Sequence, residues 1–115
     1  MEDFDRILLE TIVETFNDSI GEVNTQIIFQ YFENRSCPTQ DIPQRLAFFS
    51  SELRKIFGFG RGMMLGSAVI LEQAITERFC RKIGAKYSDK GPFAFASFIE
   101  KFREEYAKEK RVCIT

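Results

Sequence analysis

Two runs of apolar residues at helical spacing meet at a glycine-rich junction within residues 41–84. The first run ends at Phe57, and the second continues from Arg61 to Ile83. Glycine adopts a left-handed conformation without a Cβ clash, so Gly58 and Gly84 are each placed to end a helix. This pattern predicts an all-α protein with one helix over about residues 61–83. Because that helix is apolar nearly all round at its start, we expect it at the centre of the fold.

Helical spacing of apolar residues along the rest of the chain predicts a single-domain bundle of about five helices. A first helix over residues 2–17 uses Phe4, Ile7, Leu8, Ile12 or Val13, and Phe16. A second, over about residues 22–34, uses Val23, Ile27, Ile28, Tyr31 and Phe32. A third follows Asp41-Ile42-Pro43, where proline in a first turn loses no hydrogen bond, and uses Leu46, Phe49, Leu53, Ile56 and Phe57. The last begins at Pro92, uses Phe95, Phe98, Ile99 and Phe102, and frays over about residues 110–115.

The composition favours a protein that folds without metal, cofactor or disulfide. The 115 residues are 44% hydrophobic and include 13 Phe, enough for the core of one domain over residues 1–115. The chain has no His, which removes the commonest general base and zinc ligand. Its cysteines, Cys37, Cys80 and Cys113, form no Cys-x-x-Cys pair and suit reduced thiols. With no apolar run of ~20 residues and no basic leader, we expect a soluble cytoplasmic protein without a membrane anchor.

Charge is distributed unevenly along the chain. Residues 1–41 contain nine acidic and two basic residues, whereas residues 42–115 contain fourteen basic and eight acidic residues. One interpretation is that the two parts attract each other within the fold; another is that each faces an oppositely charged partner. A pI of about 5.6 argues against a dedicated nucleic-acid binder. A weak helical nucleic-acid binder remains an alternative, with the basic residues Lys101, Arg103, Lys108, Lys110 and Arg111 as its contacts.

The residues around the glycine-rich junction are the candidate interaction surface. Phe59, Met63 and Met64 supply apolar area beside Arg61, and unbranched methionines adapt readily to a partner. The alternative for these residues is a tight helix corner with core filling. The spacing Gly58-x-Gly60-x-Gly62 also suits an anion-binding loop, and a small-molecule site or an enzyme using a cleft there is a second alternative. A dinucleotide site would need a preceding strand, whereas a helix is predicted before these glycines.

Glu72 interrupts an apolar helix, so it is expected either to face solvent or to pair with Arg54, Lys55 or Arg61. The neighbouring carboxylates Glu72 and Glu77, or Glu104 and Glu105, lie among opposite charges, which is typical of a solvated helix face. An enzyme would need a reactive group such as a Cys80 thiolate beside Arg78 and Arg81. No catalytic, cofactor-binding or metal-binding residue is assigned.

The chain resembles a small archaeal helical domain of unknown function that is described as an output domain of Nitrosopumilus-type signalling proteins. The resemblance rests on residues within about 20–85, namely Asp41-Ile42-Pro43, Phe49, Leu53, Ile56-Phe57-Gly58-x-Gly60, Leu71-Glu72 and Ile83-Gly84. The spacing from the glycines to Leu71-Glu72 is longer here than is usual in that family. The resemblance implies an archaeal protein that signals through protein contacts and offers no catalytic residues to transfer. We therefore predict a non-enzymatic interaction or signalling-output module whose partner is another protein or a second copy, with the first or fourth helix as a homodimer contact.

Overall fold

The computed structural model describes residues 3–57, 67–85 and 95–114, with side chains for 3–57, 68–85 and 95–107. Its helices are α1 (Asp3–Ile20), α2 (Glu22–Glu33), the 3-10 helix η1 (Thr39–Gln44), α3 (Leu46–Phe57), α4 (Ser67–Ile83) and α5 (Phe95–Ile114). These ranges contain no strand, and the predicted all-α, single-domain bundle is confirmed.

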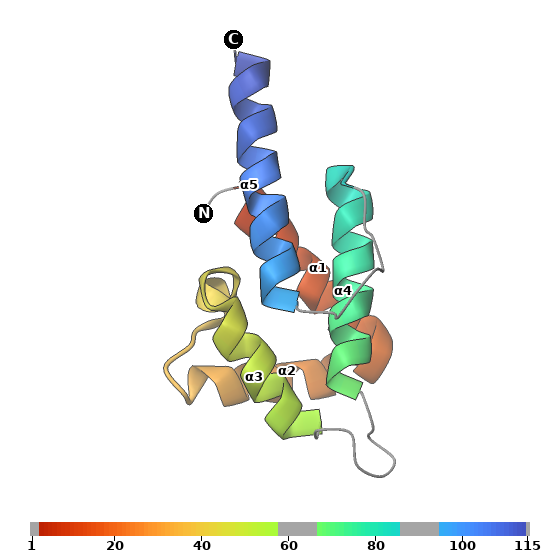
Figure 1. Cartoon of the computed structure of the whole chain (residues 1–115). Coiled ribbons are helices and arrows are strands. Elements are labelled where there is room, and N and C mark those ends of the chain that lie inside the picture. Colours follow the sequence, from red (N-terminus) through yellow and green to blue (C-terminus); the bar gives the residue numbers. More distant parts are fainter. Residues whose placement is uncertain (1–2, 58–66, 86–94, 115) are drawn as a thin grey trace.

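The helices pack around one hydrophobic core, and Figure 1 shows their arrangement. α4 and α5 run side by side in the same direction, and the far end of α5 projects beyond the other helices. α1 crosses them and also packs on α2 and η1, while α3 packs on α4 and α5. The described part of the predicted central helix, α4, packs on α1, α3 and α5, and α1 and α3 likewise each pack on three elements. Residues 61–66 of that predicted helix lie outside the described residues.

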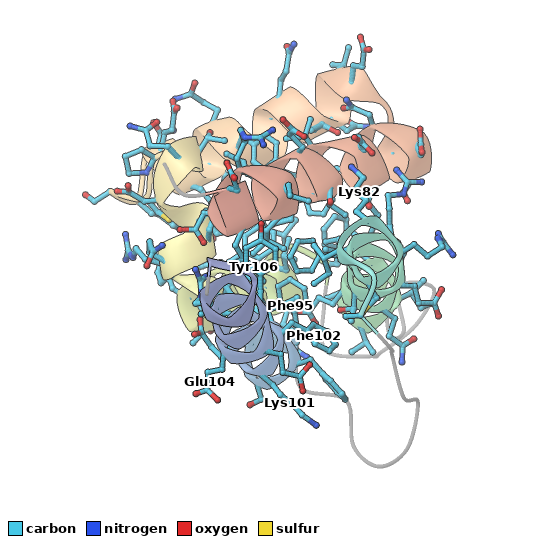
Figure 2. All side chains as sticks on the ribbon, turned by 90° about the horizontal axis from the view of Figure 1, so that it is seen from above. Lys82, Phe95, Lys101, Phe102, Glu104 and Tyr106 are labelled. Atoms are coloured by element: carbon cyan, nitrogen blue, oxygen red, sulfur yellow. The ribbon has the colours of Figure 1, made fainter. Side chains whose placement is uncertain are left out.

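Phenylalanine rings connect the helices through the core. Phe16 of α1 stacks on Phe29 of α2 and on Phe49 of α3, with ring centroids 5.8 and 6.1 Å apart. Phe49 continues to Phe95 at the start of α5, at 6.2 Å. Phe95 and Phe102 turn toward the interior, whereas Lys101 and Glu104 of the same helix point away from it (Figure 2). Ring pairs of this kind add about 0.5–1.5 kcal/mol beyond burial, so α5 is held through its aromatic face.

Buried threonines occupy α1, α2 and α4 without leaving a hydroxyl unsatisfied. Thr11, Thr15, Thr25 and Thr76 each donate to the backbone carbonyl four residues earlier, at 2.7–2.8 Å. A hydroxyl bonded to its own helix can be buried at little expense, whereas an unbonded one is destabilising. The helices can therefore pack closely at these threonines, because each hydroxyl already has a hydrogen-bond partner in its own helix.

Most helix ends follow from the sequence. Gly84 has φ 72°, and the Ala85 amide donates to the carbonyl of Cys80 at 3.0 Å, which is the Schellman arrangement that ends α4. Gly58, the other predicted cap, lies outside the described residues. α1 continues to Ile20, three residues beyond the predicted end at Asn17, and stops where Gly21 has φ 87° and ψ 160°.

Two predictions for the second and third helices were wrong. Pro43 lies in η1 and not in the first turn of α3, because Arg45 adopts φ −131° and ψ 47° and separates the two helices. Val23 and Ile27 were placed on the buried stripe of the second helix, but their side chains are 71% and 61% exposed. The buried residues of α2 are Thr25, Ile28 and Phe32, so the helix turns a different face to the core.

Candidate functional site

The predicted interaction surface of Phe59, Arg61, Met63 and Met64 lies wholly outside the described residues. The same is true of the Gly58–Gly62 junction, and with it the proposed anion site. The described residues instead present three buried carboxylates, a buried thiol in α4 and an exposed apolar face on α2.

Glu72 of α4 is fully buried and pairs with Arg54 of α3, which confirms one of the partners expected from the sequence. Arg54 Nη2 lies 3.1 Å from Glu72 Oε1, and Arg54 Nη1 donates to Oε2 at 3.4 Å. The contact at Oε1 is an ion pair only, since no described donor is aligned with that oxygen. Burial raises the pKa of Glu72, and the Ser50 hydroxyl and Arg54 guanidinium offset only part of that effect.

Glu52 of α3 is also buried, but it has several donors. Lys55 Nζ lies 2.9 Å from Oε2, Arg35 Nε lies 3.1 Å from Oε1, and the Tyr31 hydroxyl donates to Oε1 at 3.4 Å. The Arg35 guanidinium also covers the Tyr31 ring, 4.0 Å from its centroid. The hydrogen bond from Lys55 is the main cause that lowers the pKa of Glu52, so its carboxylate stays charged.

Asp5 of α1 is the third buried carboxylate and joins three elements. It accepts hydrogen bonds from Arg103 of α5 and from Gln44 of η1. Arg103 also donates to the carbonyl of Pro43 at 2.8 Å. Arg103, which the nucleic-acid-binding alternative would use as a contact, is thus engaged inside the fold. Lys101 is exposed, while the side chains of Lys108, Lys110 and Arg111 lie outside those described.

Cys80 does not provide the reactive thiolate that the enzyme alternative requires. Its side chain is buried in α4, and burial, assisted by Glu105 and Glu77, raises the pKa of the thiol to about 11. At neutral pH only about one such thiol in 10⁴ is ionised. Cys37 is likewise buried and free, with its pKa raised by burial. Glu72 is buried and paired with Arg54 whereas Glu77 is exposed, so these two carboxylates do not form an acid–base pair.

Ion pairs join the acidic part of the chain to the basic part. Arg78 of α4 lies 2.7 Å from Asp18 of α1 and 3.8 Å from Glu14. Lys82 lies 2.7 Å from Glu14, on the side of α4 that faces α1 in Figure 2. Together with Asp5 and Arg103, these pairs agree with the interpretation that the two charged parts attract each other within one fold.

The outer surface of α2 carries two of the three large apolar side chains that are exposed in the described chain. Val23 and Ile27 are one helical turn apart, and the half-buried Tyr31 follows after another turn. A shallow groove runs along them; the residues that line it, called the α2 face below, are Val23, Gln26, Ile27, Gln30, Tyr31 and Asn34. The polar residues of this face are all amides or a phenol, so it carries no formal charge. Ile70 of α4 is equally exposed, at 63%, but lies outside this groove.

The comparisons with known proteins leave the α2 face to be interpreted from its own chemistry. No family model, no curated protein and no solved structure matches this chain. In the described residues no helix has the length and apolarity that a bilayer crossing requires, and no three potential ligands gather to hold a metal ion.

Proposed function

We propose that this protein is a non-enzymatic protein–protein interaction module that binds through the α2 face. The observation that carries the proposal is the exposure of Val23 and Ile27 on one helical line, 71% and 61%, beside the ring of Tyr31. An exposed apolar stripe bordered by polar groups is typical of docking surfaces. Its amide groups both donate and accept hydrogen bonds, which suits contact with another protein.

The buried charged groups support this proposal over an enzymatic function. Glu72 and Asp5 each pair with an arginine of another helix, and Glu52 pairs with Arg35 of the turn that follows α2, so all three connect elements of the fold. Cys80 is protonated and enclosed. These groups are thus occupied in holding parts of the fold together, whereas the α2 face is an exposed feature that the core does not use. A role as a signalling output would follow if the partner belongs to a sensory pathway.

Capture from the native cytoplasm tests the proposal, with the full chain immobilised as bait. Ile27→Lys places a charge in the centre of the α2 face, and it should remove the proteins that wild type retains. Ile70→Lys is the matched control, because Ile70 is just as exposed on another helix and should retain them. Capture that is equal for all three baits, with unchanged helicity, would overturn the α2 face as the binding surface.

A further inference from the structure

The two long edges of the α2 face carry opposite charge, and this asymmetry bears on which partner fits. On one edge lie Glu22 and Glu33, both exposed, on the same line of the helix as Gln26. On the opposite edge lies Tyr31, with Arg35 stacked over its ring. The face is therefore a neutral apolar strip with an acidic edge on one side and, on the other side, an edge where the Arg35 guanidinium covers Tyr31.

The edge at Tyr31 and Arg35 keeps a net positive charge when its ion pairs with Glu52 are taken into account. Arg35 and Lys55 both contact one carboxylate, Glu52, so two cations share a single anion there. Arg35 and Lys55 are each exposed, and their remaining donors can reach a partner. The acidic edge holds two carboxylates along the helix at Glu22 and Glu33. A complementary partner must then present a basic edge, an apolar strip and an acidic edge, in that order.

A second copy of the same chain presents that order when the two α2 helices run parallel. In a two-fold dimer, each chain offers the same patch to the other. If the helices are parallel, the two-fold axis runs along them and places the acidic edge of one chain against the basic edge of the other. If they are antiparallel, the axis lies across them and places like edges together, which is repulsive.

We infer that the α2 face is the contact of a parallel, two-fold symmetric homodimer, in which Val23 and Ile27 each meet their own counterparts. This inference rests on the proposed function and names the occupant of the same surface. Glu33 of each chain then lies beside the Arg35–Lys55 edge of the other, in the way that edge charges select partners in parallel coiled coils. Because the apolar strip is short, the dimer is weak and depends on concentration.

Sedimentation velocity over a wide range of protein concentration tests the dimer. The wild-type mass should rise from 13.4 kDa toward twice that value as concentration increases. Ile27→Lys should stay monomeric at every concentration, and Ile70→Lys should behave as wild type. Circular dichroism melting of both variants shows whether the fold is retained. A wild-type protein that is monomeric throughout would overturn the homodimer.

Disulfide trapping tests the parallel orientation. In a Cys113→Ser background, Val23→Cys should form an intermolecular disulfide several-fold faster than Ile70→Cys, because only the former meets its own counterpart. In an antiparallel pair centred at Ile27, Val23 would instead lie opposite Tyr31 of the other copy. Fast trapping of Ile27→Cys without Val23→Cys would therefore overturn the parallel arrangement.

The outcomes also separate this inference from the proposed function. A monomer that still captures a foreign protein, in a way that depends on Ile27 and not on Ile70, would overturn the homodimer and leave the interaction function standing. A monomer that captures nothing would overturn both. Dimerisation lost in Ile27→Lys and kept in Ile70→Lys, with fast trapping at Val23, is the result expected from the geometry.

Discussion

The two buried glutamates of the α3–α4 region show how neighbours determine what a buried carboxyl does. Glu52 receives contacts from Lys55, Arg35 and Tyr31, whereas Glu72 has Arg54 as its cation and one oxygen without an aligned donor among the described groups. Contacts that outweigh burial lower the pKa of Glu52, and burial that outweighs contacts raises the pKa of Glu72. The same residue type therefore responds to pH in opposite directions within one fold.

Replacing each of these glutamates with glutamine should give stability differences of opposite sign. The folded protein holds the Glu72 proton more tightly than the unfolded chain, so this group loses stability as pH rises from its ordinary pKa of 4.5 to the raised value. Glu72→Gln lacks that loss and should gain stability relative to wild type across this interval. The Glu52 pKa lies below 4.5 in the folded protein, so its contribution grows as pH rises to 4.5, and Glu52→Gln should fall behind wild type there.

Urea unfolding between acidic and neutral pH measures both differences, and each variant serves as the control for the other. In the pair of Glu72 with Arg54, removing the arginine should be more destabilising than removing the charge of the glutamate. Arg54→Met should destabilise the protein at neutral pH by up to about 3 kcal/mol, because it leaves a buried carboxylate without its partner. Parallel pH profiles for wild type and Glu72→Gln would contradict the assigned role of this carboxyl.

The sequence offered the pairing of Glu72 with Arg54 as one of its alternatives, but it did not indicate the exposure of Val23 and Ile27, for a physical reason. A charge inside an apolar helix has few acceptable environments, so its partner could be sought among nearby cations, and Arg54 is that partner. Apolar residues carry no such restriction, because a folded surface contains many of them. α2 has two apolar lines, one through Val23 and Ile27 and one through Ile28 and Phe32, and periodicity alone does not say which is buried.

At the scale of the element, two glycines determine where α1 and α4 end, and they do so in different conformations. Gly84, at φ 72°, lies in the left-handed helical region, which asparagine also enters. Gly21, at φ 87° and ψ 160°, lies in a region that is essentially restricted to glycine. A Cβ at either position would meet no atom within 4 Å beyond the adjacent residues of the chain. Any loss on substitution therefore comes from the backbone and not from a collision.

Alanine substitution should consequently be more destabilising at Gly21 than at Gly84. We expect a loss of about 1 kcal/mol for Gly84→Ala and about 2–3 kcal/mol for Gly21→Ala, with Gly84→Asn less affected than Gly84→Ala. Thermal unfolding followed by circular dichroism gives the order directly. Equal losses at the two glycines would mean that the turn after α1 relaxes to another conformation.

The sequence located the end of α4 because a glycine was followed by a change in pattern, whereas the start of α3 was misplaced. Proline at the first turn is compatible with an α-helix and equally with a 3-10 turn. The choice was made by tertiary contacts: Ile42 and Pro43 are buried, and the Pro43 carbonyl accepts a hydrogen bond from Arg103. Arg103 lies 60 residues further along the chain, so no local pattern could indicate this contact.

At the scale of the whole molecule, the uneven charge of the sequence becomes a set of contacts between α1 and α4. Glu14 and Asp18 come from the acidic part, and Arg78 and Lys82 come from the basic part. Single exposed pairs contribute little, about 0–1 kcal/mol each, but these share residues and act at one helix interface. The net charge of −1 therefore hides an attraction between the two parts that becomes effective only when the chain folds.

Reversing the charges of α4 at this interface should lower the stability of the fold, and reversing those of α1 as well should restore it. Arg78→Glu with Lys82→Glu turns attraction into repulsion and should reduce the free energy of unfolding by about 2 kcal/mol at low salt. Adding Glu14→Lys and Asp18→Lys restores opposite charges and should recover most of that loss. The differences should shrink at about 1 M salt, where the screening length is only about 3 Å. Arg81→Glu, a reversal at an exposed position of the same helix, is the control and should have little effect. If the fourfold variant is no more stable than the double variant in urea unfolding, these charges do not stabilise the contact between α1 and α4, and packing alone holds that interface.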